Sequence, residues 1–168
     1  TAANTDGSIN STVSANTTNG FSIVKYTGTG SGQSNVTIGH GLGAVPKVIL
    51  FKQLDTGSWI VYHHTIGKDK YLVLDTTAAE ANATGICNPT STNIVLETSY
   101  GGTNSTAGMI AYCFADVQGF SKFGSYTGNG SADGTFVYLG FKPAFVLRKY
   151  TTGGTAGGEG WEMLDGTR

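Results

Sequence analysis

Charged side chains are scarce in this sequence. Lysine, arginine, aspartate and glutamate together make up 12% of its 168 residues, and the formal net charge is −1. No cluster of lysine or arginine is present, whereas a protein that reads nucleic acid needs a basic surface to neutralise phosphates. No apolar run approaches the roughly 20 residues with which a helix crosses a bilayer. We therefore expect neither a nucleic-acid partner nor insertion into a membrane.

Cysteine and proline are also rare, with two and three residues. Cys87 lies in a loop-like stretch and Cys113 in a strand pattern, without the spacing of metal ligands. Because free cysteine packs like a small apolar side chain, two buried thiols are favoured over one disulfide, and both alternatives stay open. Three prolines are too few for a collagen or a polyproline stalk.

Glycine, threonine, serine and asparagine are abundant instead, and eight Phe, eight Tyr and two Trp provide a core. Short segments rich in Val, Ile, Tyr, Phe and Thr alternate with glycine-containing turns, which is typical of antiparallel sheets. We predict an all-β protein, an antiparallel β-sandwich with a jelly-roll-like arrangement. The predicted strands are residues 9–15, 21–26, 35–38, 47–54, 59–62, 71–74, 93–98, 109–115, 122–126, 135–139, 144–150 and 161–164.

One stretch favours a helix. Residues 76–83 are rich in alanine, and Thr77 and Glu80 have the spacing of a capping box. We predict one or two helical turns here that end near Gly85.

The sequence also repeats itself. Residues 20–31 read GFSIVKYTGTGS, and residues 119–131 read GFSKFGSYTGNGS. In both copies there follows a Gly-x-x-Pro strand entry, at Pro46 and Pro143, and then a tryptophan, Trp59 or Trp161. Three elements in the same order indicate two units with a period near one hundred residues.

The repeat predicts a division into three parts. Residues 1–19 form a lead-in with one strand, residues 20–118 the first unit, and residues 119–168 a second, incomplete unit. Half of a sandwich exposes apolar faces and sheet edges. Three explanations stay open: a fragment of a longer repeat protein, a second unit that packs on the first, or strands donated by a neighbouring subunit.

These repeated strings resemble repeat units in large virion proteins of tailed bacteriophages, especially marine ones, over most of residues 8–168. The resemblance implies a structural protein on the outside of the virion, in a tail fibre or a surface appendage, that acts in host attachment. It also implies a homotrimer, contacts with other virion proteins, and a glycan or protein of the host surface as a further partner. Two alternatives are kept, a capsid-decorating protein and a bacterial surface filament or adhesin subunit joined by strand donation.

Residues that carry chemistry show no catalytic pattern. The four glutamates, Glu80, Glu97, Glu159 and Glu162, include no pair set apart as in glycoside hydrolases. We expect no enzyme, cofactor or metal site. His40, in a glycine-rich loop, is a candidate subunit contact, and the aromatic side chains are candidate ligand or subunit contacts because sugars stack on such rings. The candidates are His40, Trp59, Tyr100 and Tyr126.

Low charge also favours association. Repeated like charges would repel one another across a symmetric interface, and a net charge near zero promotes contact between copies. We therefore expect an obligate homo-oligomer; the trimer itself follows from the resemblance alone.

Overall fold

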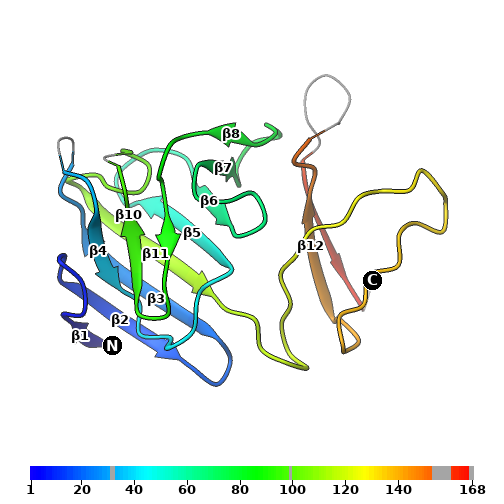
Figure 1. Ribbon diagram of the computed structural model, residues 1–168, viewed down its shortest axis with the longest axis horizontal. Helices are drawn as coiled ribbons and strands as arrows, with labels where there is room; N and C mark the ends of the chain where they lie inside the picture. The colour runs from blue at the N-terminus through cyan, green and yellow to red at the C-terminus, as the bar shows by residue number, and fades with distance from the viewer. Residues whose placement is uncertain (31–32, 99, 153–159, 167–168) are drawn as a thin grey trace.

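The computed structural model describes residues 1–30, 33–98, 100–152 and 160–166. Over these residues the protein is all-β, with antiparallel sheets and no helix, so the predicted fold class is confirmed in its coarse form (Figure 1). Two sheets of unequal size share one core, and a separate two-stranded hairpin follows them.

The large sheet has eight strands in the order β1-β2-β3-β11-β5-β6-β7-β8. Its central strands alternate buried and half-buried side chains, as expected for a sheet with one face on a core. The strands are Ala2–Asn4 (β1), Ser11–Asn16 (β2), Phe21–Thr27 (β3), Val48–Gln53 (β5), Ile60–His63 (β6), Lys70–Val73 (β7), Ala81–Asn82 (β8) and Gly108–Phe114 (β11).

The small sheet lies over one face of the large one, in the order β4-β10-β9. Its strands are Val36–Gly39 (β4), Asn88–Pro89 (β9) and Asn93–Leu96 (β10). A parallel bridge from Ile9 to Ile38 ties it to the lead-in of the large sheet. Residues 1–19 therefore belong to the same body as the first unit, and they contribute two strands, β1 and β2, rather than the one predicted.

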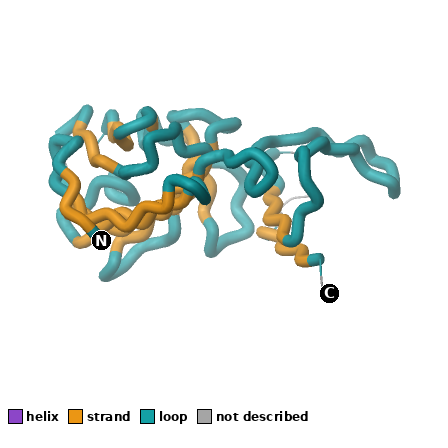
Figure 2. The backbone as a smooth tube through the Cα atoms, turned by 90° about the horizontal axis from the view of Figure 1, so that it is seen from below, coloured by secondary structure: helices purple, strands orange, loops and turns teal. Residues whose placement is uncertain are grey.

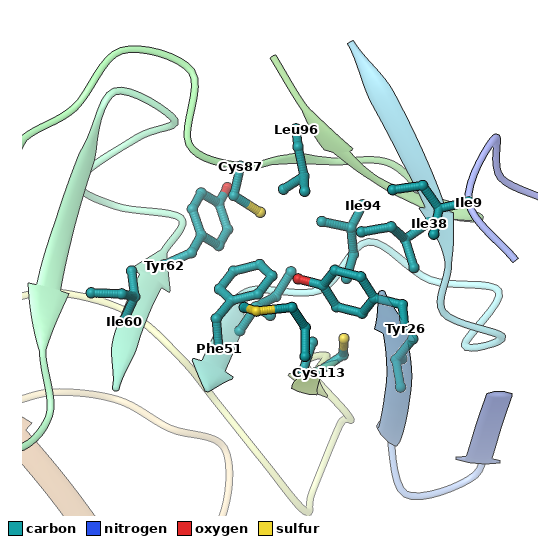
Figure 3. Packing of buried hydrophobic residues seen from close by; sticks show 14 of the residues in the cluster. Ile9, Tyr26, Ile38, Phe51, Ile60, Tyr62, Cys87, Ile94, Leu96 and Cys113 are labelled. Carbon is teal, nitrogen blue, oxygen red and sulfur yellow. The ribbon is translucent and has the colours of Figure 1, made fainter. Parts of the chain in front are cut away.

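The core lies between the two sheets. Figure 3 shows Ile38 and Ile94 of the small sheet facing Tyr26 and Phe51 of the large one. Ile38, Ile94 and Phe51 are fully buried. Each such side chain contributes about 1.5–3 kcal/mol by leaving water, so this core holds the first unit together.

A hairpin of Phe145–Lys149 (β12) and Trp161–Asp165 (β13) lies beside this body (Figures 1 and 2). Hydrogen bonds join the two, since the Trp161 Nε1–H donates to the Val73 carbonyl at 2.9 Å and the Glu80 N–H donates to the Thr151 carbonyl at 3.2 Å. The register of the hairpin repeats that of β5 and β6. A shift of 97 residues for β5 and 102 for β6, the spacings of the repeated prolines and tryptophans, turns the pair Val48–His63 into Phe145–Asp165. The two units thus share one hairpin, which supports the repeat found in the sequence.

The helix predicted for residues 76–83 is wrong. Ala81 and Asn82 form strand β8, which pairs with β7. Glu80 forms an ion pair with Lys70 instead of capping a helix, and Thr76 accepts a hydrogen bond from the Ala78 N–H at 3.4 Å. One or two isolated turns gain too few hydrogen bonds to offset helix nucleation, whereas a sheet edge is already in place.

Two strands predicted in the second unit, residues 122–126 and 135–139, are also wrong, because the structure has no strand there. The same kind of sequence forms β3 in the first unit, where β2 and β11 flank it. Strand β11 already has β3 on one side and β5 on the other, so it cannot pair with residues 122–126 as well. A strand without neighbours has no partners for its backbone groups, and it does not form.

Candidate functional site

A hollow of about 320 Å³ opens beside strands β6 and β7. Two tyrosines, Tyr71 of β7 and Tyr100 of the loop after β10, lie in its wall with ring centroids 5.3 Å apart. The lining residues are Gln53, Gly57, Ser58, Ile60, Tyr71, Val73, Tyr100 and Gly102. Tyr100 is the one candidate contact from the sequence that lines this hollow.

The loop that carries Tyr100 is held by its own backbone. The N–H groups of Thr103 and Asn104 both donate to the Tyr100 carbonyl, at 3.0 and 2.8 Å. A Cβ at Gly102 would lie 2.6 Å from the Tyr100 ring and 2.7 Å from Ile60. Glycine is therefore needed at position 102 for the loop to approach the sheet and to seat the Tyr100 ring.

The hollow combines ring faces with polar groups. Burial, and after it a hydrogen bond with Tyr71, raises the pKa of Tyr100, so the two tyrosine side chains are joined at this wall. Gln53 and Ser58 supply further donors and acceptors. A few polar groups around an apolar floor are what a small neutral ligand, such as a sugar, requires.

His40 lies inside the first unit rather than on its surface. Its ring is fully buried. Nε2 lies 3.1 Å from the Thr90 carbonyl, and Nδ1 accepts from the Leu42 N–H at 3.2 Å, which matches a neutral ring protonated on Nε2. Burial lowers the pKa of His40 and favours the same neutral form. The ring therefore links the glycine-rich loop, through the Leu42 N–H, to the turn between β9 and β10, through the Thr90 carbonyl.

Trp59 does not line the hollow. Its ring stacks on Tyr112 of β11, with centroids 5.9 Å apart, and Tyr112 in turn lies 6.5 Å from Phe21. Tyr112 alternates with the core residues Ala111 and Cys113, so this row of rings lies on the face of the large sheet that is turned away from the core. The structure thus separates Trp59 from Tyr100.

Tyr126 lies in the second unit and is 51% exposed. Its hydroxyl bonds the Arg148 side chain of β12, and this bond, together with Glu162, raises the pKa of Arg148. The sequence candidates are therefore found in four separate places.

A second hollow, of about 240 Å³, lies where the two units join. Phe21 and Phe120, the phenylalanines of the two repeated Gly-Phe-Ser strings, both line it, together with Phe114 and Phe123. The sequence analysis did not select these rings. The signal that could have found them is the repeat itself, since it gives both strings the same phenylalanine.

The glutamates that the structure describes have partners within the chain. Glu80, Glu97 and Glu162 each form an ion pair with a basic side chain, and Glu159 lies outside the described residues. Cys87 and Cys113 are free and buried, and burial raises the pKa of both thiols, that of Cys113 to about 12. No group of three or more His, Cys, Asp or Glu that could hold a metal occurs in the part of the chain that the structure describes. Over the same residues, no helix is long and apolar enough to cross a membrane.

Comparison with known proteins gives one match. A family model described as a domain of unknown function, DUF7483, covers residues 1–168. No curated protein and no solved structure matches the chain.

Proposed function

The chain belongs to the DUF7483 family, whose function is unknown, and we propose that it is a structural and adhesive module of a tailed-bacteriophage particle. Its place is a tail fibre or a surface appendage that contacts the host. Two things support the proposal. The repeated strings resemble virion repeat units, and the protein has a repeated β architecture.

One observation carries the proposal. The hairpins β5–β6 and β12–β13 have the same register at a spacing of about one hundred residues. Proteins that repeat one structural unit along the chain build elongated assemblies, in which each unit contacts its neighbours. A fibre or an appendage is such an assembly.

The form of the module belongs to the same proposal. We take one complete module to be a β-sandwich related to the jelly rolls, with the large sheet and the small sheet as its two layers. Its role is mechanical, because the layers resist extension while the loops between strands contact the host surface. The hollow beside Tyr71 and Tyr100 is the place where such a loop region offers rings and hydrogen-bond donors to a glycan.

Association between copies is a further part of the proposal. Large apolar side chains lie exposed in the second unit, among them Phe136 at 87% and Tyr138 at 80%. Apolar surface of this kind is typical of interfaces. We expect a homotrimer, and sedimentation equilibrium at micromolar concentration tests it: a single-chain mass contradicts this part.

The location on a particle is tested directly. Phage particles purified from the source of the sequence are digested and searched by mass spectrometry for peptides of this chain. Antibodies against residues 1–118 then label the particles for electron microscopy. Label on fibres or appendages is the expected result. Label spread over the capsid supports a capsid-decorating protein instead, and absence from the particle contradicts a virion protein altogether.

A second candidate is favoured by one feature. Among the described strands, β12 pairs with β13 alone, and a strand with one strand neighbour is the structure that filament subunits use when they accept a strand from another subunit. Label on bacterial surface filaments, with none on particles, would support this bacterial alternative.

A further inference from the structure

The β12–β13 hairpin is exposed at one end and half-buried at the other. Phe145 and Leu164, at the first end, are 55% and 54% exposed. Lys149 and Trp161, at the opposite end, are half-buried. A hairpin of two strands alone is at best marginally stable in water, so the half-buried end is where further contacts hold it in place.

The half-buried end meets the β7–β8 segment, residues 73–80, which leads from the last residue of β7 to β8 (Figure 1). Three hydrogen bonds span the contact, and in each the acceptor is a backbone carbonyl. They run from the Trp161 Nε1–H to Val73 at 2.9 Å, from the Lys149 Nζ–H to Thr77 at 2.9 Å, and from the Glu80 N–H to Thr151 at 3.2 Å. Since each side both donates and accepts, the segment and the hairpin end are complementary.

The first unit itself holds the β7–β8 segment in place. The Leu74 N–H donates to the Trp59 carbonyl at 3.0 Å. The Glu80 carboxylate forms an ion pair with Lys70, and the residues that follow Glu80 form β8, which pairs with β7. The segment is therefore fixed at both ends by contacts that do not involve the hairpin.

The corresponding hairpin of the first unit uses the same two side chains differently. Lys52, at the position of Lys149, donates from Nζ to three carbonyls of its own turn at 2.8–3.0 Å. Trp59, at the position of Trp161, stacks on Tyr112. Strands β11 and β7 flank that hairpin in the large sheet, so it needs no contact with another unit. The bonds of Lys149 and Trp161 to the β7–β8 segment thus take the place of sheet neighbours.

We propose that the β7–β8 segment is a docking surface for the hairpin of the unit that follows it, and that Trp161 and Lys149 hold the hairpin there in one orientation. The partner that fits this surface is a β-hairpin with a lysine at the end of its first strand and a tryptophan at the start of its second. The first unit is therefore the template on which the hairpin of the next unit becomes ordered. The inference goes beyond the proposed function, because it describes how consecutive units join, whatever assembly they belong to.

Amide hydrogen exchange of the full chain, followed by NMR, tests the inference. Because the Gly166 N–H donates to the Ala144 carbonyl, the alternation of the ladder makes Val146 and Leu164 a hydrogen-bonded pair. Trp161→Phe keeps a ring and removes the indole N–H. We expect it to lower the protection of the Val146 and Leu164 amides at least about threefold, and at least about tenfold when Lys149→Met is added.

The first unit supplies the matched controls. Trp59→Phe and Lys52→Met make the same changes at the corresponding positions, and they should leave the protection of the hairpin amides within about twofold. Protection of the β3 amides shows in every variant that the first unit is folded. Backbone nitrogen relaxation gives a second readout: the hairpin should tumble with the first unit in the unaltered protein, and independently of it in the variant with both Trp161→Phe and Lys149→Met.

Three results would overturn the inference. Unprotected Val146 and Leu164 amides in the unaltered protein would mean that docking does not order the hairpin. Unchanged protection in the double variant would mean that contacts within the second unit, such as the ion pair of Arg148 with Glu162, hold the hairpin instead. Equal losses in the Trp59→Phe and Trp161→Phe proteins would show a general loss of stability. The particle-labelling experiment is independent of all three, since it tests where the protein is found.

Discussion

The two units place nearly the same string in two environments. Tyr26 in the first unit is 3% exposed, and its hydroxyl donates to the Thr103 carbonyl at 2.5 Å. Tyr126, its counterpart in the second unit, is 51% exposed. The tyrosine and the glycines after it are shared, but residues 23–25 read IVK where residues 122–125 read KFGS, so the strings differ in this part as well as in their neighbours.

The neighbouring strands explain part of the difference. Residues 21–27 form β3 because β2 and β11 pair with both of its edges. The hairpin of the second unit forms nonetheless, since β12 and β13 are close in sequence and satisfy each other. Pairing between strands close in sequence is therefore present in both units, whereas the long-range pairing of β3 with β11 is found in the first unit. Long-range pairing is the harder of the two to form, because it must offset a larger loop-closure cost.

The largest expected contrast lies in the paired hairpins. Ile49→Ala removes a fully buried side chain, and we expect a loss of about 2–5 kcal/mol in the free energy of unfolding, from lost burial and a cavity. Val146→Ala, at the corresponding position, should lose less than about 1 kcal/mol because that side chain already contacts water. Urea unfolding measures both variants, and equal losses would mean that the two hairpins share one environment.

A second contrast concerns the glycine that opens each string. Gly20 and Gly119 both have positive φ, of 64° and 77°. A Cβ at Gly20 would also lie 2.6 Å from Val117 and 2.8 Å from the Ala115 carbonyl oxygen, whereas nothing lies within 4 Å at Gly119. Gly20→Ala should therefore lose about 2–3 kcal/mol and Gly119→Ala about 1 kcal/mol or less. Thermal unfolding of the two variants gives the difference, and the reverse order would contradict the packing of Gly20 against the segment that follows β11.

Much of the fold could be predicted from the sequence where the pattern is local. Alternation in residues 109–115 identified β11 with a shift of one residue, and the repeat with its prolines and tryptophans marked the strands that form both hairpins, though not their pairing. The helix was predicted from a capping box at Thr77 and Glu80, which is a local signal. The helix is absent because the Glu80 carboxylate forms an ion pair with Lys70, ten residues before it, and the backbone of residues 81–82 pairs with β7. The short strands β1, β8 and β9 were not predicted either; each has two or three residues, too few to show an alternating pattern, although each pairs with a strand next to it along the chain.

The candidate site could be predicted only in part. Tyr100 was selected because aromatic rings in turns bind ligands, and it does line a hollow. Tyr71 was not selected, although Trp59 and Tyr126 were chosen from predicted strands like the one that holds it, and no spacing links Tyr71 to Tyr100. His40 was selected as a candidate subunit contact in a glycine-rich loop, but its ring is fully buried, where it hydrogen-bonds with the backbone of Leu42 and Thr90.

A third contrast isolates one hydroxyl group. Tyr26→Phe leaves the Thr103 carbonyl without its donor in a buried place, and we expect a loss of about 1–2 kcal/mol. Tyr126→Phe removes a hydroxyl that bonds Arg148 at the surface, and its effect on unfolding should be within about 0.5 kcal/mol of zero. The same urea titrations measure both, and an equal loss at Tyr126 would show that the second unit is packed as tightly as the first.

The smallest contrast is in pH dependence, because the first hairpin ends in His63 where the second has Asp165. Burial, and then the neighbouring His64, lowers the pKa of His63 from 6.5 to about 4, while Asp116 opposes the shift. The folded ring stays neutral at a pH where the unfolded ring binds a proton. Its contribution to stability is therefore complete above about pH 6.5 and is lost as the pH falls toward 4.

We expect His63→Asn to flatten the decline in unfolding free energy between pH 6.5 and 4, measured by urea titrations at constant ionic strength. Part of the decline should remain, because burial lowers the pKa of His40 as well. If unfolding free energy falls with pH equally in His63→Asn and in the unaltered protein, the His63 ring is open to water in the folded chain, as side chains of the second hairpin are. The comparison of the two units would then rest on the core positions alone.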